Sequence, residues 1–224
     1  RNQFVLDFTR QEVVDAIYDM MAKILREAKV SYIKWDMNRC ITEAFSAKLP
    51  ADRQGELFHR YILGVYQLYE RLTSEFPHVL FESCSSGGGR FDPGLLYYAP
   101  QGWASDDSDA IERLKIQYGT SMCYPISSIG AHVSVVPNHQ VFRVTPLETR
   151  ANVAHFGTFG YELDLNKLTA DEREMVRGQI QFMKQYREII QFGTFYRLIS
   201  PFDNSQFTAW MVVSEDKKTA LVGY

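Results

Sequence analysis

The chain has 224 residues, of which 46% are apolar, so it can form one large domain or one and a half ordinary ones. Its 24 basic and 27 acidic residues leave a formal net charge of −3, and no stretch is apolar enough to span a bilayer, so neither a nucleic acid nor a membrane is indicated as a partner. Three widely spaced cysteines without a CxxC pair argue against a disulfide framework or a zinc site, and they predict a reducing, cytoplasmic location.

Both ends of the sequence look internal. The chain begins at Arg1 without an initiator Met, and it ends on an apolar strand pattern. We therefore expect both termini to be cuts within a longer protein, and a missing signal peptide tells little about secretion.

Strands and helices alternate along most of the sequence. The predicted strands cover residues 4–6, 30–38, 79–81, 102–105, 131–136 and 159–163. The predicted helices cover residues 10–28, 53–76, 108–118, 146–156 and 170–191. Capping boxes at Thr9–Glu12 and Thr169–Glu172 mark the start of the first and last helices, and Pro77 stops the second.

The alternation predicts parallel βαβ units, and two folds compete for them. Six strands and five helices amount to more than half of a (β/α)8 barrel. The alternative is an open doubly wound sheet, but no Gly-rich phosphate-binding motif of the kind typical of that fold follows the first strands. Polar residues end four strands, as expected of a barrel rim: Asp36, 82–86, 105–109 and 134–139. Beyond Gly193 the pattern changes to short alternating strands, which predicts an antiparallel β domain.

The first polar cluster is Lys34, Asp36 and Asn38, which a strand would place on one face, with Trp35 and Met37 on the other. A cation, a carboxylate and an amide on one face are unusual in a core and common in a site at the mouth of a parallel sheet. The alternative is a surface strand end with a salt bridge.

The second polar cluster, residues 103–110, places three aspartates beside Trp103. Asp107 or Ser108 can cap the following helix, and Asp109 can be a favourable charge in its first turn. Asp106 is left without a structural role. Two carboxylates at strand ends suggest glycoside hydrolysis, with Asp36, kept ionised by Lys34, as nucleophile and Asp106 as general acid with a raised pKa.

The third cluster, residues 82–90, is rich in glycine and serine. It lacks the GKS/T ending of a phosphate-binding loop, so it is either a plain loop or a rim segment that lets the backbone and Cys84 approach a ligand. His132, Asn138 and His139 lack a metal-ligand pattern with a nearby carboxylate, so no metal site is predicted.

Six motifs occur in a fixed order: residues 34–39 (KWDMNR), 84–92 (CSSGGGRFD), 103–110 (WASDDSDA), 116–121 (IQYGTS), 130–134 (GAHVS) and 137–140 (PNHQ). With them the chain resembles the α-galactosidases of glycoside hydrolase family 36 over nearly its whole length. The resemblance implies a retaining enzyme with Asp36 as nucleophile and Asp106 as acid/base. It also implies a galactose pocket lined by Lys34, Asn38, Cys84, Gly87 and Trp103.

The resemblance further implies that residues 1–193 are part of a (β/α)8 barrel, from the end of its third strand to its eighth. Residues 194–224 would begin a C-terminal β-sandwich domain. The expected partner is an oligosaccharide such as melibiose or raffinose, without cofactor or metal, and the expected assembly is a homo-oligomer, a tetramer. A galactosyltransferase of the same family is the main alternative, and a carbohydrate-binding protein without catalysis is a weaker one, because both aspartates are present.

Overall fold

The computed structural model describes residues 4–203 and 206–224. The chain divides after Pro100 into two compact units, which are described separately. It is a mixed α/β protein in which parallel strand pairs come first and a small antiparallel sheet comes last, and the described residues do not form a closed barrel. Across these residues, no helix combines the length and the apolar character needed to cross a membrane.

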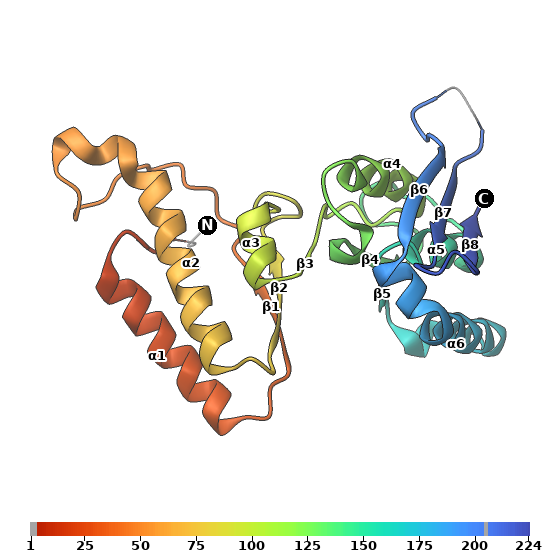
Figure 1. Ribbon diagram of the computed structural model, residues 1–224, viewed down its shortest axis with the longest axis horizontal. Coiled ribbons are helices and arrows are strands. Elements are labelled where there is room, and N and C mark those ends of the chain that lie inside the picture. Colours follow the sequence, from red (N-terminus) through yellow and green to blue (C-terminus); the bar gives the residue numbers. More distant parts are fainter. Residues whose placement is uncertain (1–3, 204–205) are drawn as a thin grey trace. The chain divides into compact units, whose positions relative to one another are not determined.

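The first unit places two long helices beside a parallel strand pair (Figure 1). Its elements in chain order are α1 (Gln11–Glu27), β1 (Tyr32–Asp36), the 3-10 helix η1 (Ala51–Glu56), α2 (Leu57–Glu75), β2 (Leu80–Cys84) and α3 (Pro93–Tyr98). β1 and β2 pair in parallel, with Lys34 opposite Glu82 and Asp36 opposite Cys84. The strand–helix–strand alternation predicted for this region is therefore confirmed.

The core of this unit lies between the strands and the two long helices. Leu68, Tyr69 and Leu72 of α2 are fully buried, and Trp35 and Phe81 of the strands pack against them. The Trp35 and Tyr69 rings lie 4.7 Å apart. Burial of these large apolar side chains, at about 1.5–3 kcal/mol each, is the main force that fixes the face which β1 turns to the helices.

Two local predictions for this unit are wrong. Thr9 does not cap α1, which starts at Gln11 after an Arg10 that makes no side-chain cap; the Thr9 hydroxyl instead donates to Asp7 Oδ1 at 2.6 Å. No strand forms at residues 4–6. Asp7 also accepts a hydrogen bond from Ser46 at 2.6 Å, so the Thr9 hydroxyl belongs to a small polar cluster rather than to a helix cap.

Helix α3 was not predicted from the sequence, although the residues that start it are adjacent in the chain. Asp92 precedes Pro93, and its side chain accepts hydrogen bonds from the backbone N–H groups of Gly94 and Leu95 at 2.9 and 3.0 Å. An aspartate cap followed by proline at the first helical position is a common helix start.

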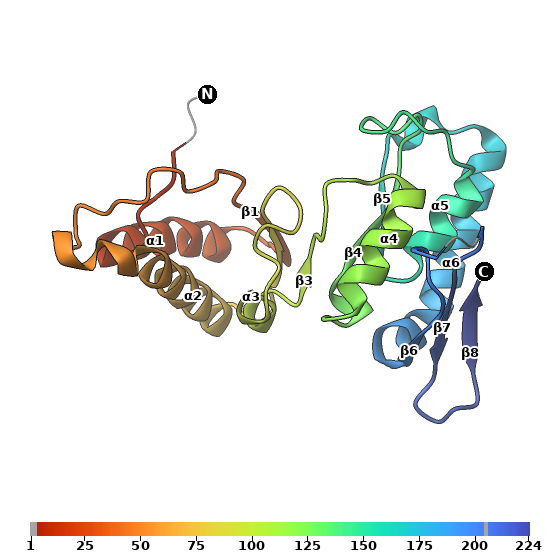
Figure 2. The ribbon, with the colours of Figure 1, turned by 90° about the horizontal axis from the view of Figure 1, so that it is seen from above.

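The second unit again pairs parallel strands and then changes to an antiparallel sheet (Figure 2). Its first elements are β3 (Gln101–Gly102), α4 (Ala110–Ser121), the 3-10 helix η2 (Ile126–Ser128), β4 (Gly130–Ser134), α5 (Leu147–Ala154) and β5 (Thr158–Glu162). They are followed by the 3-10 helix η3 (Leu165–Lys167), α6 (Ala170–Phe192), β6 (Thr194–Ile199), β7 (Ala209–Val213) and β8 (Ala220–Gly223).

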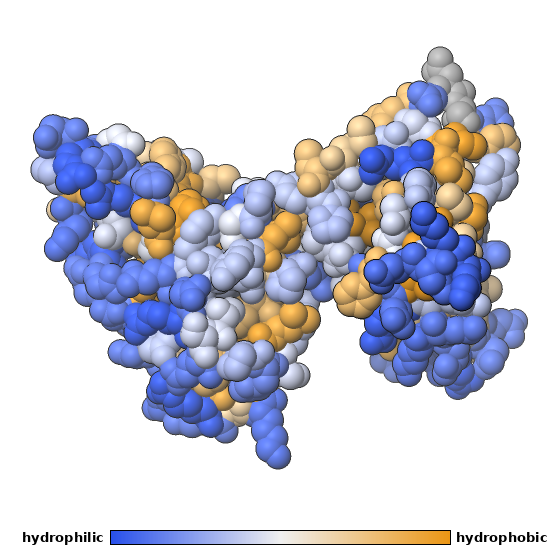
Figure 3. Space-filling view, in the orientation of Figure 1, coloured by the Kyte–Doolittle hydropathy of each residue, from blue (hydrophilic) through white to orange (hydrophobic). Residues whose placement is uncertain are grey.

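The core of the second unit forms where α5 covers the β4–β5 pair. Ala131 and Val133 of β4 are fully buried, and Ala151 of α5 packs against them. The predicted Thr169–Glu172 capping box at the start of α6 is confirmed by reciprocal hydrogen bonds of 2.8 and 3.2 Å. The visible surface of α6 is largely hydrophilic (Figure 3), as expected of a helix that buries one narrow face.

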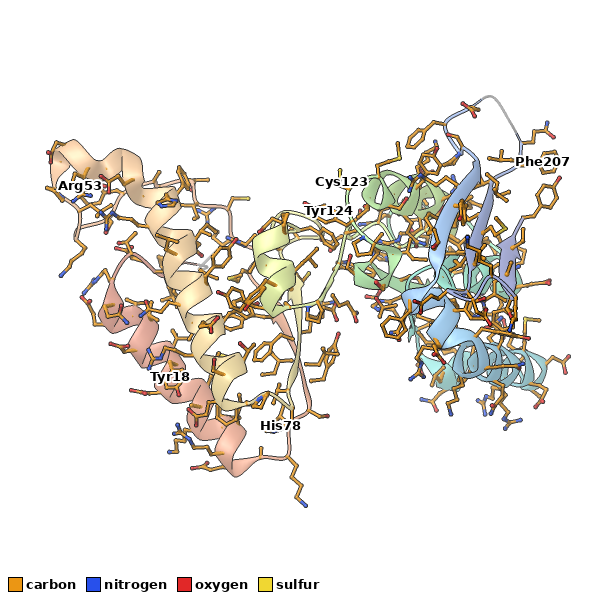
Figure 4. The ribbon with its side chains drawn as sticks, viewed as in Figure 1. Tyr18, Arg53, His78, Cys123, Tyr124 and Phe207 are labelled. Atoms are coloured by element: carbon orange, nitrogen blue, oxygen red, sulfur yellow. The ribbon has the colours of Figure 1, made fainter. Side chains whose placement is uncertain are left out.

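The antiparallel sheet packs on the end of the α/β part of this unit. Trp210 of β7 is buried, and its ring lies 5.4 Å from that of Phe156, which follows α5. The change of pattern predicted beyond Gly193 is therefore seen as a change from parallel to antiparallel pairing. The rings of Phe207, which precedes β7, and Tyr224, which follows β8, are stacked and largely exposed, and Phe207 is labelled in Figure 4.

Candidate active site

The end of β1 has the predicted two-sided pattern. Lys34, Asp36 and Asn38 are exposed on one face, while Trp35 and Met37 are partly buried against the core. The Asn38 amide donates to Asp36 Oδ2 at 2.7 Å, so these two residues form a polar pair. The Asp36 carboxylate also interacts with the neighbouring Cys84 thiol, and because it is exposed it can contact a ligand.

Lys34 pairs with a buried carboxylate that the sequence reasoning did not single out as functional. Its Nζ lies 3.4 Å from Oε1 of Glu82, which is the register partner of Lys34 on β2 and is only 3% exposed. The Tyr32 hydroxyl donates to the other oxygen of the same carboxylate. Glu82 lies in the cluster 82–90, but nothing local in the sequence identifies its partners.

The loop after β2 wraps around the end of β1. The Met37 N–H donates to the Cys84 carbonyl at 3.0 Å, and the Ser86 N–H donates to Asn38 Oδ1 at 2.7 Å. Ser86 and Gly87 have positive φ angles of 47° and 78°, a conformation that glycine adopts readily. Of the two interpretations, these contacts favour a rim segment that orients Asn38, and through it Asp36.

A cavity of about 600 Å³ opens beside this strand end, within the range of small-ligand sites. Lys34, Asp36, Asn38 and Arg39 line its polar part, and Tyr61 contributes to its apolar part. The first unit therefore brings together four of the predicted site residues around β1 and the β2 loop, since Cys84 lies opposite Asp36. Gly87, the fifth, follows in the same loop.

Burial raises the pKa of the Cys84 thiol to about 11, and the Asp36 carboxylate adds to this rise, whereas the Gly87 backbone opposes it. The thiol is therefore neutral near pH 7 and can donate a hydrogen bond, but it is a poor nucleophile. A buried, neutral thiol of this kind suits a residue that contacts a ligand without reacting with it.

A pH-dependent reactivity follows for Cys84. Because only the thiolate reacts with iodoacetamide, the alkylation rate of Cys84 in the full-length protein is expected to rise about tenfold per pH unit from pH 8 to 10 without levelling off. Peptide mass spectrometry measures this rate, and a Cys84→Ser variant identifies the peptide. A plateau near pH 8.5, as for an ordinary thiol, would contradict the burial of this group.

In the second unit, Trp103 is the centre of the second polar cluster. Its indole N–H donates to Asp106 Oδ1 at 3.1 Å. One face of its ring is stacked on His132 of β4 at 4.6 Å, and the Arg113 guanidinium lies 4.7 Å from the ring centroid. Trp103 is buried and Asp106 is exposed, so a rigid side chain holds a solvent-accessible carboxylate.

The other two aspartates of the cluster have structural roles, but not those predicted. Asp109 is the N-cap of α4, accepting from the N–H groups of Ile111 and Glu112 at 3.0 and 3.1 Å. Asp107 accepts from the Asp109 N–H at 3.0 Å. The helix therefore starts at Ala110 rather than Ser108, and its cap is Asp109 rather than Asp107 or Ser108. Asp106 instead accepts the hydrogen bond from the Trp103 indole.

Arg113 was also missed by the sequence reasoning. Its side chain is 2% exposed and donates hydrogen bonds to the Ser105 carbonyl, at 3.2 Å, and to the Gly130 carbonyl. These hydrogen bonds connect the loop after β3 to the start of β4. Burial lowers its pKa to about 10, which still leaves it charged at neutral pH. A buried arginine at helical spacing in α4 leaves no local sequence signal.

Among the described residues, no group of three or more His, Cys, Asp or Glu side chains is arranged to hold a metal ion. His132 lies in β4, within the strand predicted at residues 131–136, and its ring is stacked on Trp103. Asn138 caps its own loop and donates to Ser108 Oγ at 3.2 Å. The predicted site residues thus form two groups, one around Asp36 in the first unit and one around Asp106 in the second.

Comparisons with known proteins find close relatives along the whole chain. A family model described as Melibiase matches residues 1–193. Alpha-galactosidase AgaA of Geobacillus stearothermophilus is 58% identical over 224 residues, which is 100% of this chain and 31% of that protein. The chain therefore spans about a third of the length of this relative.

Solved structures of the same relative match equally well. Variants of AgaA crystallised with raffinose and with stachyose are both 57% identical to this chain, with TM-scores of 0.96 and 0.95. Each alignment covers 99% of this chain and 31% of the solved chain.

Proposed function

Because the chain belongs to the melibiase family, within glycoside hydrolase family 36, we propose that it is part of a longer α-galactosidase. The full-length protein would remove terminal α-galactosyl residues from oligosaccharides of the raffinose and stachyose type, the sugars bound in the two AgaA complexes. The reaction would proceed with retention of configuration, by two displacements at the anomeric carbon.

The separation of two aspartates supports the choice of Asp36 and Asp106 as the catalytic pair. The AgaA variants crystallised with raffinose and with stachyose each have one aspartate replaced, and the two replaced aspartates are 70 positions apart. Asp36 and Asp106 are the only pair of aspartates in this sequence with that separation. The alignment with AgaA covers 224 residues for a chain of 224, which favours a direct correspondence.

In the proposed reaction, Asp36 attacks the anomeric carbon while Asp106 gives a proton to the leaving oxygen. The galactosyl group is then bound to Asp36 through an ester. Asp106, now a carboxylate, takes a proton from water, the water oxygen attacks the anomeric carbon, and the ester bond to Asp36 breaks. The amide of Asn38 at 2.7 Å holds the nucleophile, and the Trp103 indole at 3.1 Å holds the acid/base.

The same contacts support a galactose pocket built from Lys34, Asn38, Cys84, Gly87 and Trp103. Lys34 supplies hydrogen-bond donors, and the neutral Cys84 thiol and the Gly87 backbone lie on the loop that closes around β1. Trp103 supplies a buried aromatic side chain of the kind that packs on sugars.

We also propose the domain arrangement expected from the resemblance. Residues 1–193 would complete a (β/α)8 barrel together with strands outside this chain, and residues 194–224 would begin a C-terminal β-sandwich. The range of the family match, which ends at residue 193, and the change to antiparallel pairing at β6 support this boundary. Assembly into a homo-oligomer remains part of the proposal.

Product stereochemistry tests the proposed function. The full-length protein is mixed with an aryl α-galactoside, and proton NMR follows the anomers of free galactose in the first minutes. The proposal expects the α-anomer first, followed by slow mutarotation to the β-anomer. First release of the β-anomer, or no release of galactose, would contradict it.

A further inference from the structure

We propose that Glu82 is a positioning residue that holds the Lys34 ammonium in the geometry needed to bind substrate. The inference rests on the proposed function, because it takes Lys34 to be a galactose contact. Glu82 itself would not touch the sugar: it is 3% exposed, whereas the Lys34 side chain is 40% exposed at the edge of the cavity.

The strand register places the two residues side by side. Lys34 and Glu82 are partners in the parallel β1–β2 pair, so their side chains leave the sheet on the same face. Lys34 Nζ lies 3.4 Å from Glu82 Oε1. Asp36, two residues further along β1, uses the same face, so an ammonium held over Glu82 stays next to the nucleophile.

The Glu82 carboxylate is held in turn from its other oxygen. Tyr32, two residues before Lys34 on β1, donates its hydroxyl hydrogen to Glu82 Oε2. Burial and this hydrogen bond raise the pKa of Tyr32, so the hydroxyl remains a donor at all physiological pH values. Of the two Glu82 oxygens, Oε2 is thus occupied by Tyr32, while Oε1 faces Lys34 and is a buried atom without a hydrogen bond in the structure.

This arrangement solves a problem that a lysine poses as a substrate contact. Lysine carries its charge on four rotatable bonds, and an exposed ammonium samples many positions. A buried carboxylate is costly unless a cation accompanies it, so Glu82 and Lys34 constrain each other. Holding a binding group in place before the substrate arrives lowers the entropic cost of binding and of reaching the transition state.

Glu82→Gln in the full-length protein tests the inference, because glutamine keeps the shape and the acceptor for Tyr32 but removes the charge. We expect kcat/KM on an aryl α-galactoside to fall about 10- to 100-fold. Glu174→Gln is the matched control, since it removes a carboxylate from an ion pair with Arg177 in which both side chains are more than 70% exposed, and it should leave kcat/KM unchanged.

Two readouts separate positioning from a merely structural role. First, Glu82→Gln combined with Lys34→Met should be no slower than Lys34→Met alone, because both changes remove the same contact. Second, kcat/KM is measured on a series of aryl galactosides that each lack one hydroxyl group. The substrate on which Lys34→Met lowers kcat/KM least should also be the one on which Glu82→Gln lowers it least. If Glu82→Gln does not fold, Glu82→Asp, which keeps the charge but retracts it, is measured with the same series.

The outcomes distinguish this inference from the proposed function. An inactive wild-type protein, or a Lys34→Met variant as active as wild type, would remove the premise that Lys34 contacts the sugar. An impaired Lys34→Met beside a fully active Glu82→Gln would overturn the inference alone. Additive losses in the double variant, without a shared hydroxyl dependence, would do the same.

Discussion

Replacement of Asp36 by alanine in the full-length protein is expected to lower the rate of α-galactoside hydrolysis by about 10⁴-fold or more. The carboxylate forms the covalent bond to the sugar in the proposed reaction, and no neighbouring group at the end of β1 can replace it, since Asn38 is neutral and Lys34 is a cation. Azide should enter the space left by the side chain and restore turnover, giving β-galactosyl azide.

The rate with an aryl α-galactoside, with and without azide, measures both effects, and NMR of the azide product gives its configuration. Asp171→Ala, at an exposed position in the first turn of α6, is the control that should retain full activity. An α-configured azide product would mean that another residue is the nucleophile, and substantial activity of Asp36→Ala without azide would mean the same.

Replacement of Asp106 by alanine is expected to have the second largest effect, and its size should depend on the leaving group. Galactosides with poor leaving groups, such as raffinose, need protonation of the leaving oxygen and should lose about 10²- to 10⁴-fold in kcat/KM. Dinitrophenyl galactosides need little protonation, so their kcat/KM should fall much less.

Asp107→Ala is the matched control, because Asp107 belongs to the same cluster but accepts a backbone hydrogen bond from Asp109. It should leave the dependence on the leaving group unchanged. Equal losses for Asp106→Ala on raffinose and on the dinitrophenyl substrate would show that Asp106 is not the acid/base. The comparison uses kcat/KM, which reports the first displacement.

The features predictable from the sequence are those set by local periodicity. The alternation of Lys34 to Asn38 gave the two faces of β1, because a strand's side chains alternate and the apolar set has to face the core. The capping box at Thr169 and the change of pattern beyond Gly193 were also predictable, because both depend on residues close together in the sequence. The start of α3 could also have been predicted, since Asp92 and Pro93 form a local helix start.

The features that could not be predicted depend on partners far away in the chain. Thr9 carries a capping-box sequence, but Asp7 and Ser46 compete for its hydroxyl. In the sequence, Glu82 is part of a loop motif, and only the strand register shows that it lies opposite Lys34. Arg113 resembles an ordinary helix residue, and only the fold shows that the Ser105 and Gly130 carbonyls accept its hydrogen bonds. Register and burial of single charges are properties of the fold, not of a sequence window.

The central claim is that Asp36 forms a covalent bond to galactose, and the mass of a trapped intermediate tests it most directly. The full-length protein is incubated with an activated 5-fluoro-α-galactoside, which slows the second displacement, and its intact mass and proteolytic peptides are measured. The account predicts a mass increase of one fluorogalactosyl group, located on Asp36 and absent in Asp36→Ala. A label on another residue, or turnover without any labelled protein, would contradict it.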